Sequence, residues 1–262
     1  MHDSTPPPVV LIIAGNDPSG GAGLAADMQA VTALGAHPAP VVSAITVQDT
    51  VNATRVEAIQ PQLIVQQAEA VLADMPVAAI KLGLLANAGI GRAVAQLLRS
   101  HAGIPVVLDP VLIAGGGAVL AEEALISVYL ETLLPLAAIV TPNAYESRRL
   151  APEGKNAAAR AAALLARNCR HVLVKGADED TADVRNVLFS HDGGQRSFSW
   201  PRLPGKYHGS GCTLASAIAA LLARGYAPLE AVEAAQRYTW ETLKQGWRLG
   251  KGQVIPNRQV KP

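Results

Sequence analysis

The sequence predicts one α/β domain in which helices cover both faces of a mainly parallel central sheet. Short aliphatic runs such as Val9–Ala14 and Val77–Leu82 alternate with alanine-rich segments of helical period. Half of the residues are hydrophobic and only 4% are aromatic, which suits the aliphatic core of a sheet that is buried on both faces. No internal repeat or long linker divides the sequence, so we expect a single domain over residues 1–262.

The order of the elements follows from the same patterns. Buried or alternating runs of β-branched and aliphatic residues predict strands over Val9–Ala14, Val41–Val47, Val77–Leu82, Pro105–Leu108, Ala137–Val140, His171–Val174, Asn186–Ser190 and Arg196–Trp200. Periodic alanine-rich segments predict helices over Leu24–Leu34, Gln62–Ala73, Ile90–Ser100, Glu122–Leu134, Asn156–Asn168, Gly211–Ala223 and Pro228–Lys244. The last two strands are expected to be antiparallel, because a short glycine-containing turn joins them.

Composition and charge exclude several classes of protein. The formal net charge is +1, from 22 basic and 21 acidic residues, so no global field attracts nucleic acid or an anionic membrane. The longest apolar stretch, Val9–Ala14, is too short to span a bilayer. Residues 1–8 read as a disordered, proline-rich lead-in rather than a signal peptide. Without export signals, Cys169 and Cys212 are expected to be reduced thiols of a cytoplasmic protein.

A glycine-rich loop follows the first expected strand, over residues 15–23 with the sequence GNDPSGGAG. Glycines such as Gly15 let a backbone approach a ligand closely, and the next helix begins with free N–H groups. The loop matches neither of the two common nucleotide-binding fingerprints, and a tight strand-to-helix turn is the alternative. Asp27, one helical turn further on, either points back toward the same cleft or faces solvent.

A second glycine-rich segment, residues 208–213 with the sequence HGSGCT, precedes an alanine-rich helix. Consecutive amides at a helix start can hold an anion, helped by the positive end of the helix dipole. Cys212 would then lie where a base takes a proton from an attacking hydroxyl, and a helix N-terminus is expected to lower the pKa of its thiol. The alternative is an ordinary helix start with a small buried cysteine.

Polar residues also end three of the other expected strands. Asn143 and Glu146 share one face of a first helical turn, where their oxygens suit Mg²⁺. The alternative for this pair is a capping box, in which each side chain bonds the other's backbone N–H. Asp109 and Lys175 each follow a strand, so we expect an acid and a cation that can neutralise phosphate on the same rim of the sheet.

Taken together, these segments resemble the hydroxymethylpyrimidine/phosphomethylpyrimidine kinases of thiamine biosynthesis, a family of the ribokinase-like superfamily. The matching blocks appear in the family's order, from about residue 9 to residue 245, as GNDPSGGAG with AD, AITVQ, KLGLL, VLDPV, TPN with Glu146, VKG and HGSGCT. The cysteine of the last block is distinctive, since most ribokinase-like sugar kinases have aspartate there. The resemblance implies a ribokinase-like fold and an ATP- and Mg²⁺-dependent kinase.

The resemblance also implies roles for individual residues. Its pyrimidine-binding residues would be Gly15, Asp27 and Gln48, with Cys212 beside the hydroxymethyl group. An anion hole would be formed by Gly209, Ser210 and Gly211. Magnesium and its waters would be organised by Asp109, Glu146 and Asn143, and the ATP phosphates would be contacted by Lys175, Thr213 and Asn143. The family phosphorylates first the alcohol and then the resulting monophosphate, and its members commonly form homodimers.

The sequence departs from the family pattern at three positions. Asn16 replaces the usual Ser or Thr, Ala177 replaces a glycine, and Gly115 lies where relatives carry a nearby lysine. Because the missing lysine removes a cation from the phosphate path, we expect the second phosphoryl transfer to be slower than the first.

Two other functions are compatible with these residues. A pyridoxal/pyridoxine kinase also acts on a ring hydroxymethyl group, but the amide of Gln48 suits both donor and acceptor positions of an aminopyrimidine. A non-catalytic ligand-binding protein on the same fold would lose the base or the metal-organising residues, whereas Cys212, Asn143, Glu146 and Lys175 are all present.

Overall fold

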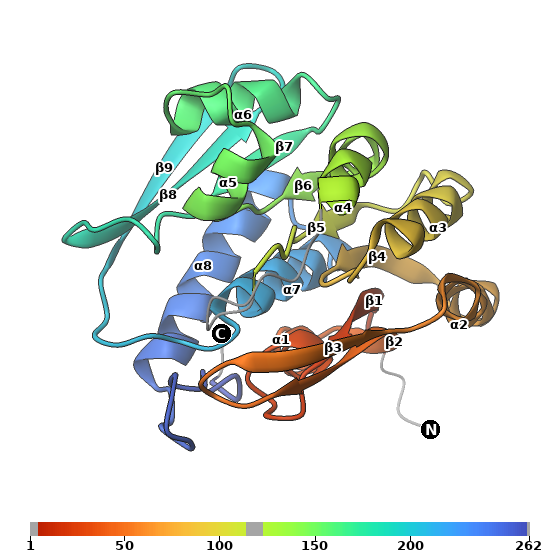
Figure 1. Ribbon diagram of the computed structural model, residues 1–262, viewed down its shortest axis with the longest axis horizontal. Coiled ribbons are helices and arrows are strands. Elements are labelled where there is room, and N and C mark those ends of the chain that lie inside the picture. Colours follow the sequence, from red (N-terminus) through yellow and green to blue (C-terminus); the bar gives the residue numbers. More distant parts are fainter. Residues whose placement is uncertain (1–4, 114–122, 261–262) are drawn as a thin grey trace.

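A nine-stranded sheet forms the centre of the computed structural model, which describes residues 5–113 and 123–260 (Figure 1). Within these residues the strand order is β3-β2-β1-β4-β5-β6-β7-β8-β9. Parallel pairing joins the six inner strands β1 (Val9–Asn16), β2 (His37–Gln48), β4 (Val77–Leu82), β5 (Val106–Leu108), β6 (Ile139–Val140) and β7 (His171–Val174). The expected mainly parallel sheet is therefore confirmed, and the carboxyl ends of these strands meet at one rim.

Helices cover both faces of the sheet. Successive side chains of β1 point to opposite faces, so that Leu11 and Ile13 join one hydrophobic core while Val10 and Ile12 join the other. The first core is closed by α2 (Pro61–Asp74), α3 (Ala88–Arg99), α4 (Glu123–Val128), α5 (Ala144–Leu150) and α6 (Ala157–Leu165). The second core is closed by α1 (Gly23–Ala33), α7 (Ser210–Ala223) and α8 (Pro228–Lys244). This burial on both sides explains why the strands read as aliphatic runs.

Antiparallel strands extend the sheet at both sides. β8 (Asp183–Ser190) and β9 (Gln195–Pro201) form the expected antiparallel pair, and β8 also pairs with β7. β3 (Ala53–Ala58) pairs antiparallel with β2, whereas a polar loop was expected there. Most side chains of β3 are exposed because it is an edge strand, so its sequence lacks the hydrophobic signal of the buried strands.

Two other segments differ from expectation. The helix expected over residues 122–134 begins as α4, then continues as a π-helical turn over Tyr129–Leu133 and a 3₁₀ turn over Leu134–Leu136. Pro135 lies in that last turn, where its missing N–H ends regular helical bonding. Residues 1–4 of the expected lead-in lie outside the described residues. The carbonyl of Pro8, just before β1, accepts a bond from the N–H of His37, the first residue of β2.

The segment after α8 returns across the carboxyl rim of the sheet. Val254 pairs with Tyr207 just before α7, and Ile255 pairs with Trp247. The N–H of Gln253 and the carbonyl of Thr50 form a bond of 2.7 Å, which joins this segment to the turn between β2 and β3. The C-terminal segment therefore contacts both sides of the rim. In the part of the chain that the structure describes, no helix has the length and apolarity needed to cross a bilayer.

Candidate active site

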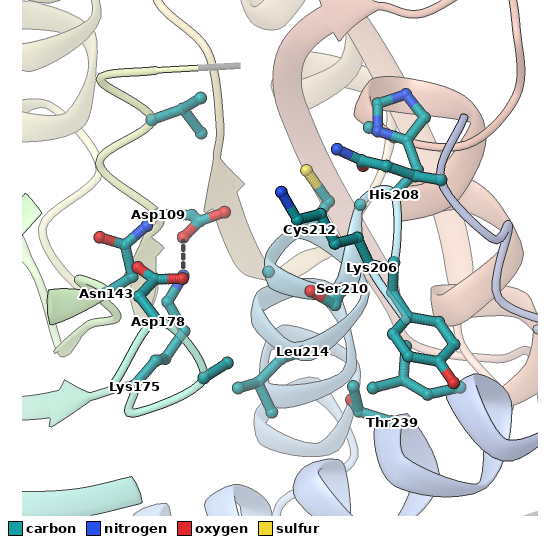
Figure 2. A pocket seen from close by; sticks show the side chains of 18 of the residues that line it. Asp109, Asn143, Lys175, Asp178, Lys206, His208, Ser210, Cys212, Leu214 and Thr239 are labelled. Carbon is teal, nitrogen blue, oxygen red and sulfur yellow. Dashed lines mark hydrogen bonds and ion pairs between the residues drawn. The ribbon is translucent and has the colours of Figure 1, made fainter. Parts of the chain in front are cut away.

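A cavity of about 720 Å³ opens at the carboxyl rim of the parallel strands (Figure 2). One wall carries Asp109, Asn143 and Lys175, and the opposite wall is the first turn of α7 with Ser210 and Cys212. The residues expected from sequence that line this cavity are Gly15, Gln48, Asp109, Asn143, Glu146, Lys175, Gly209, Ser210, Gly211 and Cys212. Strand ends far apart in the sequence thus meet at one place, as the topology requires.

The N-terminus of α7 forms one wall of the cavity. Gly209 caps the helix in the left-handed conformation, at φ 71°, and a side chain there would overlap the carbonyl of Gly21. The first intrahelical bond runs from the N–H of Thr213 to Gly209, at 2.9 Å, so the N–H groups of Ser210, Gly211 and Cys212 precede the helical ladder. These amides and the positive end of the helix dipole can bind a negatively charged group.

A charged cluster lies directly opposite this turn. The Nζ atom of Lys175 donates to Oδ1 of Asp109 at 2.9 Å, and the hydroxyl of Thr141 donates to the same oxygen at 2.9 Å. Burial raises the pKa of Asp109, but Lys175 and Lys81 outweigh it and hold the pKa below its ordinary value. A side chain at Gly211 would lie 3.0 Å from Nζ of Lys175, so glycine is what allows this cluster to approach the helix. The cluster supplies a fixed cation beside the anion hole.

Asn143 and Glu146 form the capping box of α5. The N–H of Glu146 donates to Oδ1 of Asn143, and the N–H of Asn143 donates to Oε2 of Glu146, both at 2.8 Å. Both side chains nevertheless line the cavity, and burial raises the pKa of Glu146 to about 7. The two roles considered for this pair are therefore compatible, because the cap holds the carboxyl group at the cavity wall.

The thiol of Cys212 is less acidic than the sequence suggested. Burial raises its pKa to about 11, even though Lys81 and a hydrogen bond from the N–H of Gly23 lower it. The expected lowering by the helix N-terminus is therefore wrong for this structure, because removal from water disfavours the thiolate more strongly. Cys212 is present mainly as a thiol at neutral pH.

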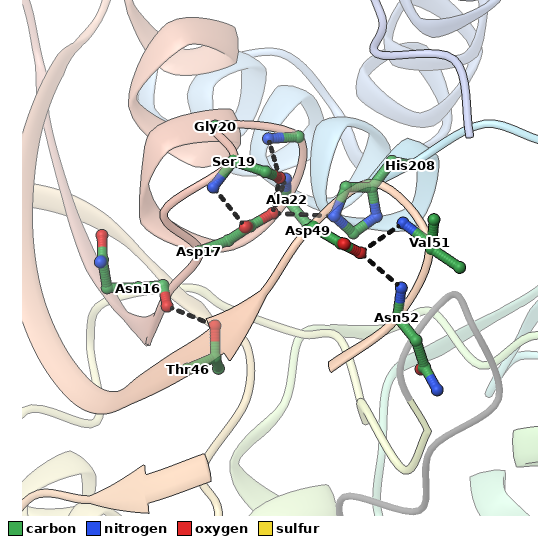
Figure 3. Close-up of polar contacts among 12 residues, drawn as sticks. Asn16, Asp17, Ser19, Gly20, Ala22, Thr46, Asp49, Val51, Asn52 and His208 are labelled. Atoms are coloured by element: carbon green, nitrogen blue, oxygen red, sulfur yellow. Dashed lines mark hydrogen bonds and ion pairs between the residues drawn. The ribbon is translucent and has the colours of Figure 1, made fainter. Parts of the chain in front are cut away.

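The loop over residues 17–22 has its own hydrogen-bond partners (Figure 3). The carboxylate of Asp17 accepts bonds of 2.8 Å from the N–H groups of Ser19 and Ala22, and the N–H of Gly21 donates to the Ser19 hydroxyl. Nε2 of His208 also lies 2.9 Å from the Asp17 carboxylate. These amides are thus engaged within the loop, which agrees with the alternative interpretation of a tight strand-to-helix turn.

Asp27 and Thr213 are buried beneath the cavity rather than in its lining. Asp27 pairs with Lys81 at 2.8 Å and accepts a bond from the hydroxyl of Ser216 at 2.8 Å, and both members of the ion pair are fully buried. Thr213 donates to the carbonyl of Gly209 and accepts from Arg258, each at 2.8 Å. Both side chains are fully buried, so neither is exposed in the cavity for the expected contact with pyrimidine or phosphate.

Gln48 ends β2 at the mouth of the cavity and is half-buried. Its neighbour Thr46 donates to the carbonyl of Asn16 at 2.9 Å, which fixes the end of β2 against the end of β1. Gln48 itself pairs through its backbone with Ala53 of β3. The amide side chain is therefore presented by two ordered strands.

Several cavity residues were not expected from the sequence. Trp200 and Trp240 stack with their ring centroids 6.4 Å apart, and both line the cavity together with Asp178, Lys206 and Arg202. The tryptophans come from β9 and α8, Arg202 and Lys206 from the loop after β9, and Asp178 from the loop between β7 and β8. The only signal in the sequence is the presence of tryptophan in a chain poor in aromatics. Gly115, the position of the missing lysine, lies outside the described residues.

An anion hole, a thiol and a lysine–aspartate cluster at the rim of such a sheet define a kinase that acts on small molecules. The pyridoxal kinase of Bacillus subtilis, solved as an ADP complex, has this fold, with 26% identity, a TM-score of 0.88 and coverage of 96% of this chain and 97% of that one. The chain belongs to the phosphomethylpyrimidine kinase family, whose model matches residues 17–257. The expected ribokinase-like fold and the resemblance stated from sequence are both confirmed.

The sequences of relatives within the family align with nearly the whole of this chain. The hydroxymethylpyrimidine/phosphomethylpyrimidine kinase of Synechococcus elongatus is 39% identical over 256 residues, which are 94% of this chain and 95% of that protein. The thiamine biosynthesis bifunctional protein ThiED of Geobacter sulfurreducens is 39% identical over 250 residues, and the chain spans only 50% of its length. The solved phosphomethylpyrimidine kinase of Clostridium difficile is 31% identical with a TM-score of 0.76, covering 88% of this chain and 97% of that one.

Proposed function

We propose that the protein transfers the γ-phosphoryl group of ATP to 4-amino-5-hydroxymethyl-2-methylpyrimidine and then to the resulting monophosphate, in thiamine biosynthesis. One observation carries the proposal: the amides at the start of α7 and the Cys212 thiol face the Asp109–Lys175 cluster across one cavity. Phosphoryl transfer needs positioning and stabilisation of negative charge more than covalent help from the protein. Family membership and 39% identity to kinases of this name support the same substrate.

The residues of the cavity divide the work of the reaction. The substrate hydroxyl oxygen forms a bond to the γ-phosphorus while the bond to the β-phosphate oxygen breaks, and ADP leaves. Cys212, as thiolate, takes the proton of the attacking hydroxyl. The amides of Ser210 and Gly211 bind the transferred group, and Lys175 neutralises its charge. Asp109 and Glu146 would hold Mg²⁺, which lowers the charge repulsion between the phosphates.

These donors are typical of a Mg²⁺ site that water and substrate phosphates complete, and not of a site in which protein side chains alone surround a metal. Among residues 5–113 and 123–260, no three His, Cys, Asp or Glu side chains form a cluster that could hold an ion alone. Magnesium usually binds through one or two carboxylates together with water and substrate phosphates. Lys175 and Thr141 engage Oδ1 of Asp109, so its Oδ2 is the oxygen placed for such a site. The carboxylate of Glu146 accepts bonds from the backbone of Asn143 and Leu112, so it would act on the metal through bound water.

A vitamin B6 kinase is the second candidate, because two comparisons point in different directions. The backbone superposes better on the B. subtilis pyridoxal kinase, at a TM-score of 0.88, than on the C. difficile phosphomethylpyrimidine kinase, at 0.76. Sequence identity favours the second enzyme, at 31% against 26%. We give more weight to identity, because substrate choice depends on a few side chains such as Gln48, whereas superposition reports the course of the whole backbone.

The experiment that tests the function is a phosphoryl-transfer assay with ATP and hydroxymethylpyrimidine, in which the mono- and diphosphate products are resolved. A competition with pyridoxal in the same assay separates the two candidates. Preferential consumption of pyridoxal would overturn the pyrimidine assignment, and failure to consume ATP with either substrate would favour a ligand-binding protein.

Replacing Gln48 with alanine is expected to weaken pyrimidine binding by roughly 1–3 kcal/mol, because ring groups that the amide satisfies would lose their partner. Binding of ATP should be unchanged. Calorimetric titration of both ligands measures the effect. Gln66→Ala, at an exposed position of α2, is the matched control. Unchanged pyrimidine affinity in Gln48→Ala would remove this residue from the site.

The apparent affinity for Mg²⁺ is expected to rise as the pH rises through about 7. The pKa of Glu146 is raised to about 7, so the side chain is neutral below that value and ionised above it. Only the ionised carboxylate attracts the cation. Titration of Mg²⁺-dependent activity at several pH values measures this, with the exposed Glu153→Gln as the control and Glu146→Gln expected to abolish the dependence. A pH-independent Mg²⁺ requirement in the native enzyme would contradict the assignment.

The proposal also includes a cytoplasmic location and a homodimer. Cys169 and Cys212 are both free thiols, which suits a reducing compartment such as the cytoplasm. A homodimer is supported by exposed apolar side chains near the rim: Ile45 and Val47 share a face of β2 and are 48% and 56% exposed, and Val51 of the next turn is 53% exposed.

A further inference from the structure

The side chain of Arg258 lies buried beneath the anion-binding end of the cavity, although it comes from the segment that follows α8. Only 1% of the residue is exposed. The hydroxyl of Tyr238 donates to the carbonyl of Arg258 at 2.9 Å, and the N–H of Asn257 donates to the carbonyl of Thr242 at 2.9 Å. Two contacts with α8 thus fix the backbone from which the guanidinium enters the core.

The guanidinium joins the two glycine-rich segments of the site. Its Nε atom donates to the hydroxyl of Thr213 at 2.8 Å, and its other N–H groups donate to the carbonyls of Gly20, Gly21 and His208 and to the side chain of Gln29. Arginine has five N–H donors in a rigid fork. Four of the five contacts go to Gly20 and Gly21 in the loop over residues 17–22 and to His208 and Thr213 around the start of α7, so one side chain bonds to both segments. This is the same loop whose amides are engaged by Asp17 and its neighbours (Figure 3).

The charge of Arg258 is unusual because each of these five acceptors is a neutral oxygen atom. A buried cation that lacks a carboxylate acceptor is costly to desolvate, so stability alone is a poor reason to keep it. Burial lowers the pKa of Arg258, and negative charge at Cys212 and Asp27 counteracts this effect. The guanidinium is therefore an electrostatic partner for negative charge at Cys212.

We propose that Arg258 is a positioning residue for phosphoryl transfer, which locks the loop over residues 17–22 against the start of α7 and places a fixed positive charge behind the anion hole. This inference rests on the proposed kinase function. Cys212 must carry negative charge to act as the base, and negative charge concentrates on the transferred group, so a preorganised cation next to them favours the reactive arrangement without rearrangement. A lysine keeps the charge, but its point-like ammonium cannot bond all of the acceptors in the two segments.

The test compares Arg258→Met and Arg258→Lys with the control Arg224→Met. Arg224 also donates to a backbone carbonyl, that of Leu34, but its side-chain partners Leu34 and Tyr226 lie outside both glycine-rich segments. In Arg258→Met, kcat is expected to fall about 10²-fold, the effect of small misplacements at reacting groups, while pyrimidine affinity stays nearly native. Arg258→Lys should recover about tenfold of that loss, and Arg224→Met should keep the native kcat.

Hydrogen–deuterium exchange gives a readout that does not depend on turnover. Amides in both residues 17–22 and 208–213 are expected to exchange faster in Arg258→Met than in Arg224→Met. If the native protein is inactive toward hydroxymethylpyrimidine while this exchange difference is present, the proposed function fails and the positioning role stands. Native kcat and native exchange in folded Arg258→Met would overturn the inference, and equal kcat in the Lys and Met variants would overturn its electrostatic part.

If Arg258→Met does not fold, the variant Tyr238→Phe tests the positioning role of Arg258 instead. This variant keeps the guanidinium and frees the carbonyl of Arg258. A lower kcat with faster exchange in both segments supports the positioning role. Native values for both measurements contradict it.

Discussion

In the Cys212→Ala variant, kcat is expected to fall by about 10²-fold or more, while the affinity for pyrimidine and ATP changes little. The thiol lies at the first turn of α7, next to the amides that would bind the transferred group, so we expect it beside the reacting oxygen rather than along the ring. General base catalysis contributes about 10²–10⁴-fold, which sets the size of the loss. Steady-state kinetics together with a calorimetric titration separate the two effects.

The pH profile distinguishes a base from a merely structural cysteine. The pKa of Cys212 is raised to about 11, so the thiolate fraction, and with it kcat/KM of the native enzyme, should increase as the pH rises above neutrality. Cys212→Ala should lose this increase. Cys169 is buried and is not among the residues that line the cavity, so Cys169→Ala is the control. Near-native kcat in Cys212→Ala would mean that the loop acts through its backbone alone.

Replacing Lys175 with methionine is expected to lower kcat by about 10²–10³-fold and to destabilise the fold. The side chain supplies the cation beside the anion hole, and losing one such donor in an active site has effects of this size. The same change leaves the buried carboxylate of Asp109 without its ion-pair partner, which costs about 3–5 kcal/mol. Kinetics and thermal denaturation measure the two consequences separately.

A double variant separates catalysis from stability. In Lys175→Met with Asp109→Asn, the unpaired charge is removed, so much of the thermal stability should return while kcat stays low. Lys155→Met, at an exposed position, is the matched control for loss of a positive charge. If the single variant Lys175→Met keeps native kcat once it is folded, Lys175 has no role in phosphate transfer.

The residues at strand ends were predictable because topology alone brings them together. Asp109 and Lys175 are 66 positions apart, and parallel strands order their carboxyl ends at one rim, where the two side chains form an ion pair. The boundaries of β4, β7 and α8 agree with the expected ones for a related reason, since each has strong local patterning bounded by clear breaks. Sequence pattern is sufficient where local and global preferences agree.

Other features depend on side-chain partners that no local pattern contains. Asp27 could face the cleft or solvent by its position in the sequence, and only the packing of α1 against α7 reveals that Lys81 and Ser216 hold it below the cavity. No sequence pattern showed that Asp17 accepts bonds from the amides of its own loop, over residues 17–22. Arg258 was not singled out at all, since a lone arginine beyond the last periodic helix gives no signal of burial.

The strand order leaves β3 and β9 as the two edges of the sheet within the described residues. Both edges carry charge: Arg55 and Glu57 pair on β3 with side chains 70% and 62% exposed, and β9 has Arg196 and ends at Pro201. Charged side chains and proline discourage another chain from adding a strand. Growth of the sheet into ordered aggregates is thereby disfavoured, and concentrated solutions of the folded protein should resist fibril formation despite the long aliphatic strands in its interior.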